Sequence, residues 1–180
     1  MLITETSLKG AFLIDIEQHQ DTRGFFARTF CQKEFSDGGL KPTIAQCNVA
    51  FNYKKGTLRG MHYQIEPATE VKLVRCTHGA IYDVIIDLRP ESPTYKLYFG
   101  VELTAENHRA LYVPEMFAHG YQTLTDDAEV VYQMSEFYAP DYQRGLRYDD
   151  PAFGIEWALP ISEISDKDTS WSPFESLIST

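Results

Sequence analysis

The feature that most constrains the fold of this chain is a series of short strand-like segments separated by turn residues. The two strongest, Val71–Thr77 and Ile81–Leu88, are rich in β-branched residues and flank His78-Gly-Ala, which predicts a β-hairpin. Segments of similar character are expected to form further strands: Ala11–Glu17, Arg23–Phe30, Ile44–Phe51, the segment around His62, Tyr95–Glu102, Arg109–Val113, Gly120–Leu124 and Val130–Phe137. About ten short strands without a long helical period indicate an all-β fold, either a closed barrel or a jelly roll.

The remaining segments are expected to connect these strands. His19–Thr22 is typical of a polar turn, and Cys31–Phe35 of a short helical turn. From Tyr138 onward the chain is rich in proline, which favours a tail that wraps around the body with one helical turn. Because no repeat, low-complexity stretch or linker interrupts the sequence, we expect residues 1–180 to form a single domain.

Charge and composition exclude several classes of function. A net charge of -10 argues against nucleic-acid binding through a broad basic surface, although a few focused cations can still hold a small anion. No apolar run approaches the roughly 20 residues that cross a bilayer, so no membrane association is expected. The start of the chain lacks the pattern of a signal peptide, and an odd number of cysteines, three, argues against a disulfide framework. The cytoplasm is therefore the expected location.

Two histidine-containing stretches, Gly56–Gln64 and Val113–Gly120, indicate a functional site. Strand alternation places His62 on one face, Lys72 on the face shared with apolar Val74, and Tyr132 on an interior face of its strand. Any one of these side chains alone is common in a core or at its rim. Three on interior faces, together with Arg59 and His119, predict a polar cavity inside the barrel.

The spacing of His62, Gln64 and Glu70 resembles the first cupin motif, and the segment around His119 resembles the second. A cupin that binds a metal ion uses two histidines as His-x-His, a glutamate and the later histidine, because a divalent ion needs three or four converging ligands. Here Gln64, a weak ligand, replaces the second histidine. A metal site formed by His62, Glu70 and His119, serving an oxygenase or isomerase, is an alternative.

Without a metal, the same residues suit the removal of a proton next to a ketone. His62 is the base, the Lys72 ammonium stabilises the enolate oxygen, and the Tyr132 phenol returns a proton from the opposite face. A carboxylate is expected behind His62 to hold its tautomer. The sequence pattern leaves four candidates for it: Asp83, Asp87, Asp166 and Asp168.

These residues lie in longer motifs, and over nearly all of its length the chain resembles the dTDP-4-dehydrorhamnose 3,5-epimerase family. The motifs are Arg23-Gly-Phe-Phe, Gln46-x-Asn48, Gly56-Thr-Leu-Arg-Gly-Met-His-Tyr-Gln64, Lys72-Leu-Val-Arg-Cys, Asp83-Val-Ile-Ile-Asp-Leu-Arg-Pro-x-Ser-Pro-Thr94, Val113-Pro-x-x-Phe-Ala-His-Gly120, Tyr132, Asp149-Asp-Pro151 and Ser165-Asp-Lys-Asp168. The resemblance implies a cupin-type jelly roll without metal or other cofactor. It also implies a homodimer in which an N-terminal strand crosses to the partner's sheet.

By the same resemblance, His62 is the base, Asp168 its carboxylate partner, Tyr132 the acid and Lys72 the group that steadies the enolate. The implied substrate-binding residues are Arg59 and His119 at the sugar and pyrophosphate, Arg23, Gln46, Asn48 and Lys167 at the nucleotide, and Tyr138, which stacks on the base. Family members invert C3 and C5 of dTDP-4-dehydro-6-deoxy-D-glucose to give dTDP-4-dehydro-L-rhamnose. Both carbons flank the C4 ketone, which agrees with the chemistry derived from His62, Lys72 and Tyr132.

Two positions depart from the family pattern. Arg28 and Gln143 stand where the family commonly has glutamates at the nucleotide end. These changes leave open an epimerase that acts at one carbon, or on a sugar linked to another nucleotide such as CDP or GDP. A sugar-binding or structural jelly roll is a further alternative, but it gives no reason for the interior Lys72 and Tyr132.

Overall fold

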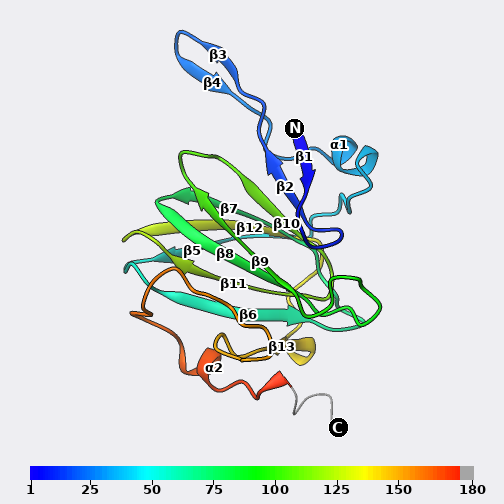
Figure 1. The fold of residues 1–180 in the computed structure, drawn as a ribbon. Helices are drawn as coiled ribbons and strands as arrows, with labels where there is room; N and C mark the ends of the chain where they lie inside the picture. The colour runs from blue at the N-terminus through cyan, green and yellow to red at the C-terminus, as the bar shows by residue number, and fades with distance from the viewer. Residues whose placement is uncertain (175–180) are drawn as a thin grey trace.

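The computed structural model describes residues 1–174, and Figure 1 shows that antiparallel strands form most of the molecule. The strands are β1 (Leu2–Glu5), β2 (Phe12–Asp15), β3 (His19–Asp21), β4 (Gly24–Phe26), β5 (Gln46–Asn52), β6 (Leu58–Gln64), β7 (Lys72–His78), β8 (Ala80–Asp87), β9 (Tyr98–Thr104), β10 (Ala110–Val113), β11 (Phe117–Thr123), β12 (Ala128–Met134) and β13 (Gln143–Gly145). The helical segments are α1 (Gln32–Asp37), a 3₁₀ turn (Pro140–Tyr142) and α2 (Asp166–Thr169). Over residues 1–174, no helix is long and apolar enough to cross a membrane.

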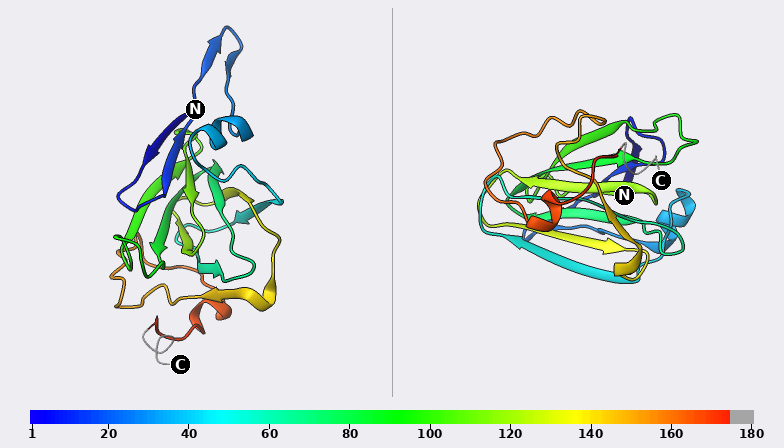
Figure 2. Two further views of the ribbon diagram at one scale, coloured as in Figure 1. Left: turned by 90° about the vertical axis from the view of Figure 1, so that its right-hand side faces the viewer. Right: turned by 90° about the horizontal axis from the view of Figure 1, so that it is seen from below.

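Two sheets lie face to face and form the body of the protein (Figures 1 and 2). The six-stranded sheet has the order β1-β2-β10-β7-β12-β5, and the five-stranded sheet has the order β13-β6-β11-β8-β9. Strands that are distant in sequence are neighbours in both sheets, with β7 between β10 and β12 and β11 between β6 and β8. This arrangement confirms the all-β jelly roll expected from the sequence.

The main hydrophobic core lies between the sheets, and strand alternation explains how it forms. Val74 and Val130 of the six-stranded sheet and Ile81 and Ile85 of the five-stranded sheet belong to one buried cluster. On β8 the intervening side chains, Val84 among them, belong to a second cluster on the outer face. Because β8 is buried on both faces, its sequence is almost continuously apolar, and this explains its strong β signal.

The N-terminal and C-terminal segments each cover the outer face of one sheet. Phe35 of α1 packs with Leu73 and Tyr112 on the six-stranded sheet. Phe153 and Phe174 of the C-terminal tail pack on the five-stranded sheet, and α2 lies at the opposite end of the molecule from α1 (Figure 2). The tail therefore wraps around the body as expected, but it contains two helical segments, the 3₁₀ turn and α2, instead of one, and it adds the strand β13.

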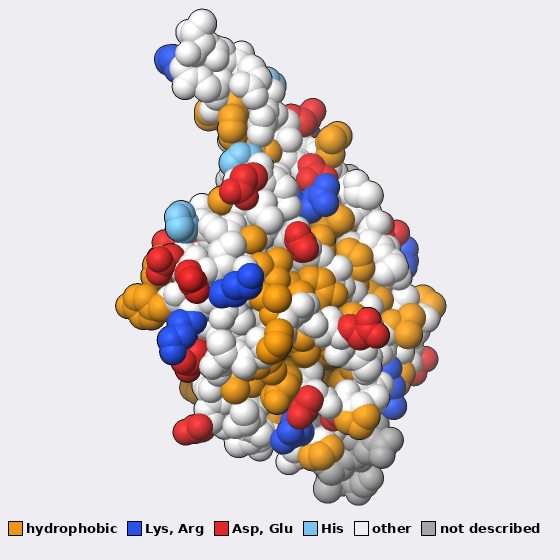
Figure 3. Space-filling view, turned by 60° about the vertical axis from the view of Figure 1, so that its left-hand side comes forward, with side chains coloured by type: hydrophobic (Ala, Val, Ile, Leu, Met, Phe, Trp, Pro, Cys, Tyr) orange, Lys and Arg blue, Asp and Glu red, His pale blue; other side chains and the backbone are white. Residues whose placement is uncertain are grey.

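A hairpin formed by β3 and β4 projects from the body (Figures 1 and 3). The sequence predicted a turn over His19–Thr22 and a strand over Arg23–Phe30, but His19–Asp21 is itself a strand and pairs with Gly24–Phe26. The turn is Thr22–Arg23, stabilised by a hydrogen bond of 2.8 Å from the Arg23 backbone N–H to the Asp21 carboxylate, and the second strand ends at Phe26.

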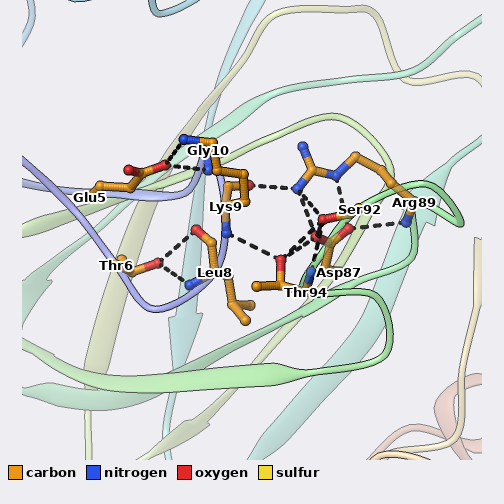
Figure 4. A network of polar contacts seen from close by, with 9 residues as sticks. All are labelled: Glu5, Thr6, Leu8, Lys9, Gly10, Asp87, Arg89, Ser92 and Thr94. Carbon is orange, nitrogen blue, oxygen red and sulfur yellow. Dashed lines mark hydrogen bonds and ion pairs between the residues drawn. The ribbon is translucent and has the colours of Figure 1, made fainter.

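A buried carboxylate, Asp87, ties the N-terminal loop to the connection between β8 and β9 (Figure 4). Asp87 accepts hydrogen bonds from the Arg89 guanidinium (2.7 and 2.8 Å), the Ser92 hydroxyl (2.5 Å) and the Thr94 hydroxyl (2.7 Å). Arg89 also donates to the Lys9 backbone carbonyl at 2.5 Å, while Thr94 Oγ1 accepts from the Lys9 N–H at 3.2 Å. Burial by itself would raise the pKa of Asp87, but these hydrogen bonds outweigh it and lower the pKa to about 2.

Replacing Asp87 by Asn should lower the free energy of unfolding by about 2–4 kcal/mol, because Arg89 loses its buried ionic partner. Since the folded pKa lies below the unfolded value of about 3.9, the stabilisation is present above about pH 4 and is lost as the pH falls toward 2. Denaturant unfolding from pH 7 to pH 2.5 should show a shallower acid decline for Asp87→Asn. Glu91→Gln, an exposed change in the same connection, is the control; equal stability of the two variants would contradict the role of Asp87.

Candidate active site

A cavity of about 490 Å³ opens between the two sheets beside the C-terminal tail. Its walls come from β5, β6, β7, β11 and β12 and from residues 163–168 of the tail. Many of the site residues expected from the sequence line it: Arg59, His62, Lys72, His119, Tyr132, Lys167 and Asp168. The structure therefore brings the four expected catalytic side chains together in one space.

A bulge between β6 and β11 directs both Arg59 and His62 toward this cavity. His62 pairs with His119 and Arg59 pairs with Tyr121, so β6 takes three residue steps where β11 takes two. Simple alternation would place Arg59 and His62 on opposite faces. At the bulge the strands approach so closely that a Cβ on Gly60, whose φ is +121°, would lie 2.6 Å from the Gly120 Cα. Both glycines are therefore needed for this geometry.

Asp168 is the carboxylate that contacts His62, among the four that the sequence left open. Oδ1 of Asp168 lies 2.6 Å from His62 Nε2, and its Oδ2 accepts a 3.2 Å hydrogen bond from the Gly60 N–H. The backbone N–H of Asp168 donates to Oγ of Ser165, the N-cap of α2, at 3.1 Å. Burial would raise the pKa of Asp168, but the His62 hydrogen bond and charge, with the Gly60 N–H, lower it overall.

An ionised Asp168 can only accept hydrogen bonds, so His62 Nε2 carries the proton and donates to it. Nδ1 is then the nitrogen that remains available as a base. The ring is partly exposed, whereas Asp168 is buried, so the base can reach a ligand while its partner is shielded from water.

Lys72 and Tyr132 come from β7 and β12 of the six-stranded sheet, whereas His62 comes from β6 of the five-stranded sheet. All three side chains line the same cavity. The buried Lys72 ammonium forms a 2.5 Å ion pair with the buried Glu70, which explains how β7 accommodates a lysine on its interior face. Burial raises the pKa of Tyr132 above its ordinary value, although the nearby Arg59 charge opposes this. The Tyr132 phenol therefore stays protonated at neutral pH and can act as a proton donor.

Buried partners also hold the other two polar groups of the cavity. His119 Nε2 lies 2.7 Å from Oδ1 of the fully buried Asp83, and the Arg59 guanidinium donates to Asn52 Oδ1 at 2.7 Å. Asn52 in turn donates to the Ala128 carbonyl at 3.0 Å. These contacts fix the directions of His119 and Arg59 before any ligand arrives.

A second cavity of about 690 Å³ adjoins the first, sharing His62, Lys72 and Tyr132 as lining residues. Four of the expected nucleotide-end residues line it: Gln46, Asn48, Tyr138 and Gln143. Gln143 Oε1 accepts from Lys167 Nζ at 2.5 Å and from the Tyr138 hydroxyl at 3.1 Å, which links the two cavities at their rim. Two joined spaces of this size can hold a ligand with two parts, one next to His62 and one next to Tyr138.

Arg23 and Arg28 lie outside both cavities of this chain. Arg23 lies in the turn of the projecting β3–β4 hairpin and pairs with Asp21 at 2.6 Å. Arg28 pairs with Glu34 of α1 at 2.9 Å and lines a small cavity beside the N-terminus. The fold of one chain therefore does not bring these two arginines to His62.

The residues considered for a metal site each have another partner. His62 contacts Asp168, Glu70 contacts Lys72, and His119 contacts Asp83. Within residues 1–174, no group of three or more His, Cys, Asp or Glu side chains is placed to hold a metal ion.

Sequence reasoning did not assign a role to three of the residues that hold the site. The sequence suggests Glu70 only as a metal ligand and Asp83 only as a candidate partner of His62, and it gives Asn52 no role. The interior phase of Asp83 on β8, shared with Ile81 and Ile85, is the signal that could have identified it as a buried partner. Asn52 and Glu70 lie at strand boundaries, where alternation gives no such signal.

The chain is similar to known proteins over almost all of its length. A family model described as dTDP-4-dehydrorhamnose 3,5-epimerase matches residues 5–176. A curated dTDP-4-dehydrorhamnose 3,5-epimerase of Methanothermobacter thermautotrophicus is 42% identical over 172 residues, covering 94% of this chain and 92% of its own length.

Two solved structures share the fold over nearly the whole chain. One is a dTDP-6-deoxy-D-glucose-3,5-epimerase from Legionella pneumophila in complex with dTDP-4-keto-L-rhamnose, with a TM-score of 0.90 and 33% identity over 97% of this chain and 93% of that one. The other is a 3′-monoepimerase from Streptomyces bikiniensis in complex with dTDP-quinovose, with a TM-score of 0.89 and 33% identity over 98% of this chain and 89% of that one. The likeness agrees with a cupin-type jelly roll.

The match of the family model extends over almost all of the described residues, and the curated relative is well above 30% identical over most of both chains. Several of the motifs quoted from the sequence contribute residues to the cavity containing His62, Lys72, Tyr132 and Asp168. This chain therefore belongs to the dTDP-4-dehydrorhamnose 3,5-epimerase family.

Proposed function

We propose that this protein inverts C3 and C5 of dTDP-4-dehydro-6-deoxy-D-glucose to give dTDP-4-dehydro-L-rhamnose, without a cofactor. The observation that carries this proposal is the placement of His62, Lys72 and Tyr132 around one cavity, with Asp168 bonded to His62 at 2.6 Å. These groups are the base, the cation and the acid that the reaction needs. The family to which the chain belongs supplies the substrate class.

In each half-reaction, His62 Nδ1 removes the proton from C3 or C5, which the C4 ketone makes acidic. The electron pair of that C–H bond moves into the ring, and the C4 oxygen becomes an enolate that the Lys72 ammonium stabilises. The Tyr132 O–H then protonates the same carbon from the opposite face, which inverts it. The phenolate regains a proton from water and His62 releases one, so the net composition of the sugar is unchanged.

Asp168 stabilises the imidazolium that forms when His62 takes the proton. Burial alone would favour the neutral acid, but the hydrogen bonds to His62 and to the Gly60 N–H outweigh it and hold Asp168 ionised, in agreement with its lowered pKa. Glu70 has a comparable role on the other side of the cavity, because it balances the Lys72 charge while the site is empty. When the enolate forms, Lys72 gains a second anionic neighbour.

The adjoining cavity is proposed to hold the nucleotide. Tyr138 is about half exposed at its rim, where its ring can stack on a base, and Gln46 and Asn48 offer amides for hydrogen bonding. Gln143, bonded to Lys167 and Tyr138, lies where the family commonly has a glutamate. An amide both donates and accepts, so Gln143 is the position at which base choice could differ from that of relatives.

A single-carbon epimerase is the second candidate. The 3,5-epimerase and the 3′-monoepimerase described above have the same identity to this chain, 33%, and nearly equal TM-scores. Overall likeness therefore does not separate inversion at two carbons from inversion at one. The number of carbons that take up deuterium distinguishes the two reactions.

Incubation with dTDP-4-dehydro-6-deoxy-D-glucose in heavy water should place deuterium at both C3 and C5, as read by mass spectrometry and proton NMR. His62→Ala should abolish this exchange while dTDP binding, measured by calorimetry, changes little, because His62 contributes chemistry rather than most of the affinity. Label at one carbon would identify a single epimerase. Exchange that survives in His62→Ala would overturn the assignment of the base.

Tyr132→Phe should separate the two proton transfers. The variant keeps His62, so deuterium exchange at the substrate carbons should continue, but inverted product should form about 10²–10⁴-fold more slowly without the acid. In the wild type, activity should not decline through loss of the Tyr132 proton until above about pH 10, because burial raises the pKa of Tyr132. Unchanged product formation by Tyr132→Phe would assign the second protonation to another donor.

We further infer that residues 1–180 act as a single domain in a cytoplasmic homodimer. The β3–β4 hairpin projects from the body and exposes 70% of Phe26, and the edge strand β5 exposes 62% of Val49. Exposed phenylalanines on a projecting hairpin and exposed apolar side chains on a sheet edge of the same chain suit a second copy of that chain. Arg23 and Arg28, which lie outside the cavities of their own chain, would then contact the partner subunit.

The cytoplasmic location is supported by the three free cysteines, which suit a reducing compartment.

Sedimentation velocity should give a dimer for the wild type and a monomer for Phe26→Asp and for Val49→Asp, because each change places a charge in an apolar contact. Leu97→Asp, at an exposed leucine in the β8–β9 connection, is the control and should stay dimeric. A wild-type monomer at micromolar concentration would contradict the homodimer.

A further inference from the structure

The helix that carries Asp168 is too short to hold its own position. α2 has four residues, Asp166–Thr169, and helices of this length have no intrinsic stability in water. It nevertheless supplies Asp168 to His62 and Lys167 to the rim of the cavity. A bond from the Arg147 guanidinium to the Thr169 carbonyl, 3.1 Å long, holds its C-terminal end. Beyond that end, Trp171 packs against β13, the strand that pairs with β6.

The Trp171 indole occupies the space that a side chain at Gly145 would need. A Cβ built on Gly145 would lie 2.1 Å from Trp171 Cε2 and 2.3 Å from its Nε1, so the indole rests directly on the backbone of β13. Gly145 is the residue of β13 that pairs with His62 of β6. The glycine therefore allows an aromatic ring to lie directly beside the strand position of the base.

Trp171 contacts the functional groups on both sides of it. Its ring centroid is 6.5 Å from that of His62, with the planes inclined at 70°, and Lys167 Nζ lies 5.9 Å from its ring centroid. The indole Nε1 is buried and has no hydrogen-bond partner among the described residues. The ring is thus held by shape and van der Waals contact and not by a polar anchor.

We propose that Trp171, seated on Gly145, is a positioning residue that sets the distance between Asp168 and His62 and directs Lys167 toward the nucleotide end. This inference rests on the proposed epimerase function. The 2.6 Å Asp168–His62 bond tolerates little movement, since a 1 Å displacement of α2 would carry it beyond hydrogen-bond length. Misplacement of that size costs about 10²-fold in rate.

The test compares initial rates of deuterium exchange in Trp171→Ala, Trp171→Phe and Gly145→Ala. The exchange rate should fall about 10–100-fold in both Trp171→Ala and Gly145→Ala. The first change removes the ring, and the second pushes the ring off the strand. Trp171→Phe keeps a flat ring and should recover most of the rate. The control is Trp157→Phe, at the only other tryptophan in the chain, which packs on the outer face of the five-stranded sheet and should keep the wild-type rate.

Two readouts separate positioning from a general loss of structure. In a background of Asp168→Asn, Trp171→Ala should cost little more than Asp168→Asn alone, because both changes remove the same support from His62. Trp171→Ala should also move the acid limb of the pH–rate profile to lower pH, as Asp168→Asn does, because the imidazolium loses its neighbouring carboxylate. If the two rate losses multiply in the double variant, or if the acid limb of Trp171→Ala stays at its wild-type pH, the positioning role is overturned.

A measurement without substrate keeps the inference separate from the proposed function. In Trp157→Phe protein, Trp171 is the single indole, and its fluorescence should fall as the adjacent His62 becomes protonated. The step should vanish in the additional variant His62→Asn and weaken in Gly145→Ala. If the wild type fails to label any 4-keto nucleotide sugar, the proposed function fails, while a titration step that needs His62 and Gly145 still supports the placement of Trp171. Absence of that step would overturn it.

Discussion

The close approach of β6 and β11 at Gly60 and Gly120 is the constraint on which the site depends. The two backbones come so near that no Cβ fits at Gly60, and the bulge that results turns both Arg59 and His62 into the cavity. The same bend leaves the Gly60 N–H available to Asp168. One steric fact therefore places His62, Arg59 and the hydrogen bond from the Gly60 N–H to Asp168.

The cavity is lined by charged groups that are already paired. Lys72 has Glu70, His119 has Asp83 and His62 has Asp168, and every carboxylate in these pairs is buried. Burying charges in this way contributes little net stability, because desolvation cancels most of the attraction. It does fix each side chain in direction, so that the developing charge of an enolate meets groups that need not reorganise. The neutral Tyr132, its pKa raised by burial, completes the set as a proton donor.

The two ends of the chain have different tasks around a shared scaffold. The N-terminal part covers one sheet, is tied to the β8–β9 connection through Asp87, and extends a hairpin away from the body. The C-terminal part covers the other sheet and returns to the cavity with Lys167 and Asp168. The position of Asp168 beside His62 thus depends on a tail segment that lies next to the packing contact between Trp171 and Gly145.

The sequence by itself determined the all-β class and the interior positions of Lys72 and Tyr132, because strand alternation is a local property with a period of two residues. Its family motifs also identified the residues that gather around His62. Alternation left four carboxylates open as partners of His62. The family resemblance pointed to Asp168, 106 residues away, and the tertiary structure shows that Asp168 contacts His62, while Asp83 contacts His119 and Asp87 contacts Arg89. The tertiary structure alone decided how Arg59 reaches the cavity with His62, through a bulge, and that Arg23 and Arg28 lie outside it. These outcomes depend on a bulge, on the pairing of distant strands and on the path of a tail. Alternation within one strand cannot reveal them, because it shows which face a side chain occupies but not what lies opposite.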